Sequence, residues 1–168
     1  ENRAAWKLAM PTTDKPTVLV LSRQNLPVIE GTKEHADEQV AKGGYVIAKQ
    51  KGEQPEGILI ATGSEVNLAV QSQAKLAEEG IDVAVVSLPS FDLFEAQSAE
   101  YKESVLPKAV KKRVAIEAAS PFGWDRYLGC KGKVIAIDHF GASAPGDKVL
   151  AEFGFTVENV VDTFKSIN

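Results

Sequence analysis

The chain has 168 residues, of which 44% are hydrophobic and 25% charged, a composition typical of a folded globular domain and not of a disordered or fibrous chain. Its formal net charge of -4 and its lack of a basic run argue against binding to nucleic acid or to an anionic membrane surface. No apolar stretch reaches the ~18 residues of a membrane-spanning helix. A single cysteine, Cys130, permits no internal disulfide and indicates a reducing, cytoplasmic setting.

The amino-terminal part of the chain predicts a helix, a strand and a linker. Apolar spacing predicts a short helix over Asn2–Met10, followed by a buried strand over Val18–Leu21. Residues 28–42 are strongly charged and poor in large apolar side chains, which favours a linker that holds at most a short exposed helix over Lys33–Ala41. Because the helix-like start has no initiator Met, we expect the chain to be a piece of a longer protein.

A strand, a helix and a second strand form the unit around which the rest of the chain is organised. Ile58–Ala61 is apolar on both faces, which is typical of a strand buried in a parallel sheet. The helix that follows is expected to be capped by Thr62 or Ser64 and to end at Gly80. Asp82–Leu88 returns as a second apolar strand, so the connection predicts a parallel pair.

The remaining elements complete a predicted three-layer α/β/α fold, whose five-stranded sheet is mostly parallel with one antiparallel edge strand. That edge strand is Tyr45–Ala48, because the short charged loop after it leaves no room for a helical crossover. The other expected elements are a turn-rich loop over Pro89–Phe94, a helix over Ala96–Val105, a strand over Arg113–Ala119, a short aromatic helix or loop over Pro121–Tyr127, a strand over Val134–Asp138, and helices over Pro145–Glu152 and Thr156–Ile167.

Two positions are candidates for contacting an anion. Gly63 lies in a strand-to-helix turn, but the chain has neither G-x-G-x-x-G nor G-x-x-x-x-G-K-[ST], so we expect a helix start there. A weak anion site at that helix N-terminus stays open as the alternative. Arg23 follows the predicted Val18–Leu21 strand, at the end where ligands gather in parallel sheets, and the alternative is an ordinary surface arginine.

The other chemistry-bearing residues do not predict an active site. Ser143 lies in GASAP, which resembles a nucleophile elbow, but Pro145 replaces the second glycine and a helix cap explains the serine better. Asp138 and His139 are adjacent, and adjacent residues do not generally aim at one hydroxyl. Glu117, near a strand end, is expected to have a raised pKa if it is shielded from water or, preferably, to make a structural hydrogen bond to a neighbouring backbone group. The sequence shows no metal-ligand spacing. Trp124 and Tyr127, which lie near Phe122 in the sequence, are expected to serve packing or an interface.

Five motifs, in fixed order and spread over nearly the whole chain, carry a resemblance to a known family. They are LSRQNLP at Leu21–Pro27, GGYVIA at Gly43–Ala48, IATGSEV at Ile60–Val66, ESVLPKAV at Glu103–Val110 and EFGFTVENVV at Glu152–Val161. Together they resemble the carboxyl-terminal part of transketolase. The pair Arg23-Gln24 favours transketolase over its thiamine-dependent relatives, such as deoxyxylulose-phosphate synthase or pyruvate dehydrogenase.

The resemblance implies a division of the chain and a function for the longer enzyme. Residues 1–27 would be the last helix and strand of the pyrimidine-binding domain, 28–42 a linker, and 43–168 the whole carboxyl-terminal domain. The family's enzyme transfers a two-carbon ketol unit between sugar phosphates of the pentose phosphate pathway, using thiamine diphosphate and magnesium or calcium at a homodimer interface. Its cofactor, metal and acid–base groups belong to the preceding domains, so we expect no catalytic, cofactor-binding or metal-binding residue here.

The same resemblance gives this chain one substrate contact. Arg23 would hold the sugar phosphate, work that suits a guanidinium because its planar fork offers paired donors and stays charged. The chain alone is expected to be inactive and to support the dimer. The alternative function is a standalone ligand-binding or regulatory module that uses the turns after Ala61, Leu88 and Ala119. Without its sheet partners, Val18–Leu21 is expected to pair with another chain, repack on its own domain or promote association.

Overall fold

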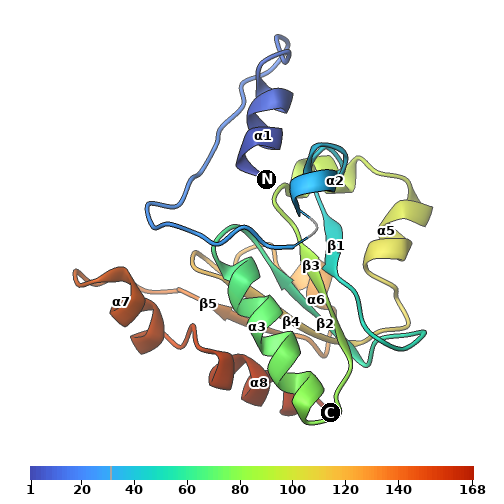
Figure 1. Ribbon diagram of the computed structural model, residues 1–168, viewed down its shortest axis with the longest axis vertical. Coiled ribbons are helices and arrows are strands. Elements are labelled where there is room, and N and C mark those ends of the chain that lie inside the picture. The colour runs from blue at the N-terminus through green and yellow to red at the C-terminus, as the bar shows by residue number, and fades with distance from the viewer. Residues whose placement is uncertain (31) are drawn as a thin grey trace.

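A five-stranded sheet lies at the centre of the computed structural model, which describes residues 1–30 and 32–168 (Figure 1). Its strands are β1 (Tyr45–Ala48), β2 (Gly57–Ala61), β3 (Val83–Ser87), β4 (Lys112–Glu117) and β5 (Lys133–Ala136). They are ordered β1-β3-β2-β4-β5, with β2 to β5 parallel and β1 antiparallel to β3. The predicted mostly parallel sheet with an antiparallel edge strand is therefore confirmed.

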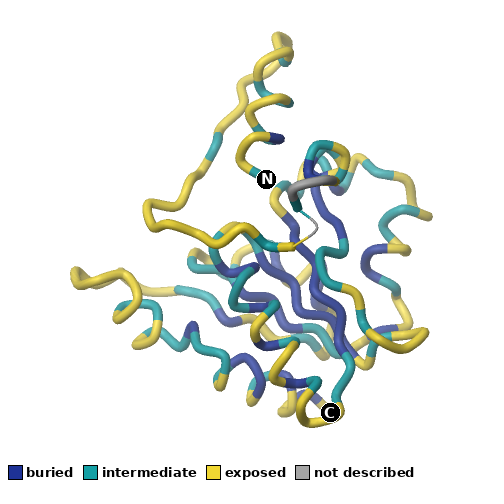
Figure 2. The backbone as a smooth tube through the Cα atoms, viewed as in Figure 1, coloured by how far each residue is buried: buried dark blue, intermediate teal, exposed yellow. Residues whose placement is uncertain are grey.

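Helices cover both faces of the sheet, which gives the predicted three layers (Figure 1). One face carries α3 (Glu65–Glu78), α7 (Gly146–Glu152) and α8 (Val157–Lys165), and the other carries α4 (Phe91–Glu95), α5 (Ala99–Val105) and α6 (Asp125–Leu128). Successive side chains of β2 enter opposite cores, because strand residues alternate between faces: Leu59 packs under α3 and α8, and Ile58 and Ile60 pack against α4 to α6. Figure 2 shows the buried residues concentrated in these strands.

A short helix, α4, replaces the predicted loop over Pro89–Phe94. The hydroxyl of Ser90 caps it by accepting a hydrogen bond from the backbone N–H of Leu93 at 3.3 Å. Phe94, a residue of this helix, is buried in the core. The loop prediction is wrong because burial and one cap stabilise a helix too short to show a helical period in the sequence.

The start of β1 passes very close to α4. Gly43 has a φ of +78°, and a Cβ added there would lie 2.3 Å from the backbone nitrogen of Phe94 and 2.5 Å from the carbonyl oxygen of Ser90. The backbone N–H of Ser90 donates to the carbonyl of Gly43 at 3.0 Å, which holds the two segments together. Only glycine fits this approach.

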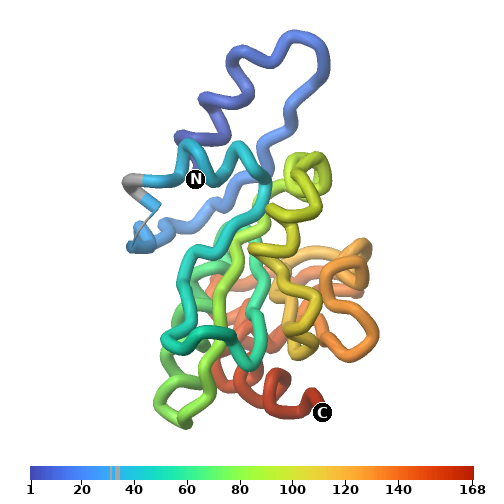
Figure 3. Tube along the Cα trace, turned by 90° about the vertical axis from the view of Figure 1, so that its right-hand side faces the viewer, coloured from blue at the N-terminus to red at the C-terminus, as the bar shows by residue number. Residues whose placement is uncertain are grey.

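The amino-terminal helix α1 (Asn2–Ala9) packs against α2 (Thr32–Val40), and the two lie side by side in Figure 3. Their contact is a small core in which Ala4 meets Val40 and Tyr45. Both helices agree with the sequence predictions. Gly31, inside the predicted linker, lies outside the described residues.

The segment Val18–Leu21 forms no strand. It is extended, pairs with none of the strands of the described chain, and leaves Val18 82% and Val20 94% exposed. The predicted strand is therefore wrong for this chain, as is the prediction that the segment repacks on its own domain. A strand exists only through hydrogen bonds to a neighbour, and this segment pairs with none of β1 to β5. Pairing with another chain stays a prediction.

Candidate functional site

The place in this fold where a ligand is most expected is the carboxyl end of β2 and β4. These strands are neighbours, yet the chain leaves β2 for β3 on one side and leaves β4 for β5 on the other. Open parallel sheets bind ligands at such a switch point, in the crevice beyond the strand ends. The polar residues that follow the two strands here are Thr62, Glu65 and Glu117.

Hydrogen bonds join these residues across the ends of the two strands. The hydroxyl of Thr62 donates to Oε2 of Glu117 at 2.7 Å, which links the two strand ends. Glu65 is only 6% exposed, and its carboxylate accepts from the Ser64 hydroxyl and from the backbone N–H of Ala118 at 3.1 Å. Neither hydroxyl caps α3, so the capping prediction is wrong: both are used to satisfy buried carboxylates instead.

Burial raises the pKa of both carboxyls at the switch point. The hydrogen bond from Ser64 opposes this rise for Glu65, and the one from Thr62 opposes it for Glu117. The nearby charge of Glu65 raises the pKa of Glu117 further. The expected rise for Glu117 and its structural hydrogen bond are both present, although the partner is a hydroxyl and not a backbone group.

Replacement of Glu117 by glutamine is expected to stabilise the chain at pH values above the raised pKa of Glu117. A carboxyl whose pKa is higher in the folded protein favours folding below its unfolded value of 4.5, and that contribution is lost as the pH rises through the folded value. Glu117→Gln cannot ionise and keeps an oxygen for the Thr62 hydroxyl. Its gain in free energy of unfolding over the wild type should grow between about pH 4 and pH 8 in urea titrations.

The control for this prediction is Glu100, an exposed carboxyl of α5 whose pKa is lowered by a backbone hydrogen bond and by the Ser98 hydroxyl. A carboxyl whose pKa is lower in the folded protein stabilises the fold at pH values above its unfolded pKa, and this contribution is lost as the pH falls through the folded pKa. Glu100→Gln should therefore lose stability relative to the wild type as the pH rises, the opposite trend. If the stability differences of both variants from the wild type changed with pH in the same direction, the opposite pKa shifts assigned to Glu117 and Glu100 would be wrong.

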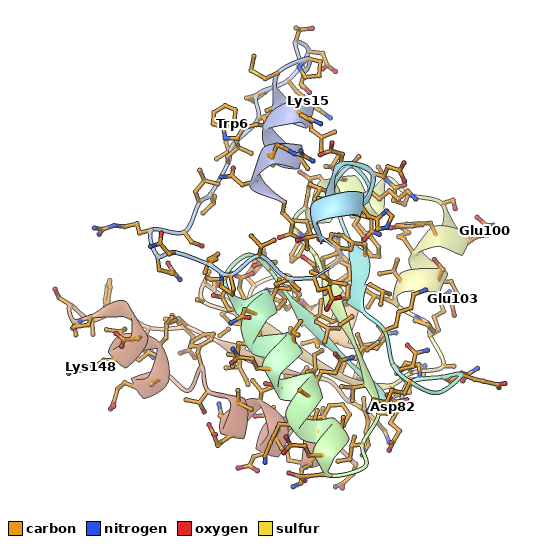
Figure 4. The ribbon with its side chains drawn as sticks, viewed as in Figure 1. Trp6, Lys15, Asp82, Glu100, Glu103 and Lys148 are labelled. Carbon is orange, nitrogen blue, oxygen red and sulfur yellow. The ribbon has the colours of Figure 1, made fainter. Side chains whose placement is uncertain are left out.

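Two hollows in the surface lie away from the switch point. One of about 500 Å³ is lined by residues that include Lys49, Gln73 and Asp82, and one of about 420 Å³ runs along β1. Figure 4 shows Asp82 at the end of the sheet opposite α1. Its carboxylate accepts from the backbone N–H groups of Lys51 and Gly52, at 2.9 and 2.7 Å, so it holds a loop in place.

The residues considered for hydrolase chemistry do not form a triad. Ser143 and Asp138 are exposed, and the ring of His139 lies against Phe153 with centroids 4.8 Å apart. The Nδ1 atom of His139 lies 2.8 Å from the carbonyl oxygen of Phe140. Helix α7 begins after Pro145 with no side-chain cap, so the predicted cap by Ser143 is also wrong.

The two aromatic residues singled out from the sequence serve packing. Trp124 and Tyr127 are buried, and each lies edge-on to Phe91, with ring centroids 5.1 and 5.0 Å apart. Phe122 is exposed. Packing is confirmed for Trp124 and Tyr127.

Arg23 lies on the exposed segment between α1 and α2. No other described residue accepts a hydrogen bond from its guanidinium, and the segment carries no secondary structure. Within residues 1–30 and 32–168 no three His, Cys, Asp or Glu side chains are grouped as metal ligands. None of the described helices is both long and apolar enough to cross a membrane.

A family model described as the transketolase-like TK C-terminal domain matches residues 43–156, which is more than half of the chain. The chain belongs to the transketolase family. The transketolase of Bacillus subtilis is 58% identical to it over 167 residues, which are 99% of this chain and 25% of the relative. The chain thus spans about a quarter of the length of that transketolase.

Solved transketolase structures share the fold. One from Leishmania mexicana superposes with a TM-score of 0.88 at 38% identity, covering 98% of this chain and 23% of that one. A mutant transketolase from Pichia stipitis, described as a complex with xylulose 5-phosphate, gives 0.86 at 39% identity and covers 96% of this chain and 23% of its own. The resemblance read from the sequence motifs is confirmed.

The switch point does not fit thiamine diphosphate. The carboxylates of Glu65 and Glu117 lie there, joined by hydrogen bonds to Ala118 and Thr62, and they would repel a diphosphate. The strand-to-helix turn at Gly63 lacks the glycine pattern that cradles phosphates. No catalytic step is therefore assigned to a cofactor within this chain.

Proposed function

We propose that this chain is the carboxyl-terminal region of a cytoplasmic transketolase, which transfers a two-carbon ketol unit between sugar phosphates with thiamine diphosphate and a divalent metal. The observation that carries the proposal is the match of residues 43–156 to the C-terminal domain family, in a chain that spans a quarter of its relatives. Residues 1–27 would then end the pyrimidine-binding domain, 28–42 would be the linker, and 43–168 would be a supporting domain of the homodimer.

The amino-terminal segment supports this division. Large apolar side chains that a finished domain would bury are exposed along it: Val18, Val20, Leu21, Leu26 and Val28. A neighbouring sheet in the longer enzyme would cover them. Arg23 lies among them with its guanidinium exposed, as a group that grips a substrate phosphate requires.

The alternative of a standalone ligand-binding module is less well supported. Its pocket would use the turns after Ala61, Leu88 and Ala119. Hydrogen bonds from Thr62 to Glu117 and from the Ala118 backbone to Glu65 already join the ends of β2 and β4, and α4 follows closely after Leu88. Neither surface hollow reaches Thr62 or Glu117.

An activity assay tests the proposal. The 168-residue chain, mixed with xylulose 5-phosphate, ribose 5-phosphate, thiamine diphosphate and magnesium, should show no ketol transfer, because the groups that perform the chemistry would lie in preceding domains. The full-length enzyme that contains this chain is the positive control and should be active. Turnover by the 168-residue chain alone, or none by the full-length enzyme, would refute the proposal.

A further inference from the structure

The carboxylate of Glu1 binds the sheet instead of its own helix. Glu1 stands at the N-cap position of α1 but makes no capping hydrogen bond. Its Oε1 atom instead accepts from the hydroxyls of Tyr45 and Ser87, each at 2.6 Å. Tyr45 begins β1 and Ser87 ends β3, and the two residues face each other in the ladder. We name these three residues the Glu1 cluster.

The two hydroxyls of the Glu1 cluster lie inside the protein. Ser87 is 0% exposed and Tyr45 is 4% exposed. Burial and the charge of Glu1 raise the pKa of the Tyr45 phenol, which keeps its proton available for donation. Buried hydroxyls need a partner, and among the described residues Glu1 is the one that both of them reach.

The other contacts of α1 are weaker or nonpolar. Arg3 and Lys7 pair with Asp37 of α2, but these charges are exposed and screened by water. Ala4 contributes a small apolar contact to the core with Tyr45. Glu1 is therefore the polar connection between α1 and the central sheet.

We propose that Glu1 joins two parts of the protein: through Tyr45 and Ser87 it holds α1 on the central sheet. Under the proposed function, on which this part of the inference rests, α1 would belong to the pyrimidine-binding domain and the sheet to the carboxyl-terminal domain, so the Glu1 cluster would be a polar contact between the two domains. The acceptor oxygen is the property that matters, because one oxygen takes both hydrogen bonds.

Hydrogen exchange on the 168-residue chain tests this inference. Glu1→Ala should speed exchange of the α1 amides about tenfold or more, the factor expected when a charged hydrogen bond is lost, and leave β2 and β4 unchanged. Glu1→Gln keeps the acceptor oxygen and should stay close to the wild type. Asp37→Asn, which weakens the exposed pairs with Arg3 and Lys7, is the control and should change exchange less than about threefold. Equal effects of Glu1→Ala and Asp37→Asn would overturn the inference.

A variant that removes the donors adds a second check. Tyr45→Phe combined with Ser87→Ala should release α1 as Glu1→Ala does. Adding Glu1→Ala to that pair should increase exchange no further, because groups in one hydrogen-bonded cluster are not additive. Additive effects would show that Glu1 acts elsewhere.

Discussion

Gly43→Ala is expected to lower the free energy of unfolding by about 2–5 kcal/mol, a large part of the ~5–15 kcal/mol that stabilises a typical domain. The new Cβ would lie 2.3 Å from the Phe94 nitrogen and 2.5 Å from the Ser90 oxygen, both backbone atoms that cannot rotate away. Overpacking of this kind adds about 1–3 kcal/mol to the ~1–2 kcal/mol of a left-handed conformation. Urea denaturation measures the change directly.

The matched control for this prediction is Gly80, which has nearly the same φ, +80°, but has nothing within 4 Å of an added Cβ. Gly80→Ala should therefore lose only the conformational share, about 1–2 kcal/mol. The difference between the two variants isolates the clash with α4. Equal losses would contradict the close approach of Gly43 to that helix.

Arg23→Ala is expected to reduce kcat/KM for a ketose phosphate about 100-fold in the full-length enzyme. Two charge-assisted hydrogen bonds to phosphate, together worth about 3 kcal/mol, correspond to that factor. Arg23→Lys keeps the charge but not the paired donors, so its kcat/KM should lie between the values for the wild type and for Arg23→Ala. The loss should appear as a higher KM and should vanish for the ketose that lacks its phosphate.

Lys15 provides the control for Arg23, because it is another exposed cation of the amino-terminal part (Figure 4). Lys15→Ala removes the same charge from outside the SRQN motif and should change kcat/KM less than about threefold. Similar losses in the two variants would indicate general attraction of the anionic substrate. A loss in Arg23→Ala that is independent of the phosphate would exclude the proposed contact.

The parallel strands could be predicted from the sequence because each is a short, mostly apolar run. The predicted strand Ile58–Ala61 differs from β2 by one residue at its start. The segment Val18–Leu21 has the same pattern, yet it forms no strand, because pattern reports the tendency to be buried and not the presence of a partner. The sequence does not predict helix α4, because packing of Phe94 stabilises this helix and its five residues are too few to show a helical period.

The polar contacts were harder to predict because they join distant parts of the chain. Glu1 and Ser87 are 86 positions apart, and Thr62 and Glu117 are 55 apart. A serine in an otherwise apolar strand was a signal that something polar meets it, but the sequence does not say which residue. The sequence favours helix-capping roles for Thr62 and Ser64, because a cap needs only a nearby backbone partner. In the folded chain their hydroxyls donate to the carboxylates of Glu117 and Glu65 instead.

The strand order has a consequence for how this chain is made. The central strand β2 pairs with β3, which follows soon after it, and with β4, which follows much later. On the ribosome, the β2–α3–β3 unit therefore emerges and assembles with one edge of β2 unpaired until β4 leaves the exit tunnel. During that interval the most apolar strand of the protein is open to nascent-chain aggregation, so a chaperone that shields this edge would raise the yield of folded protein.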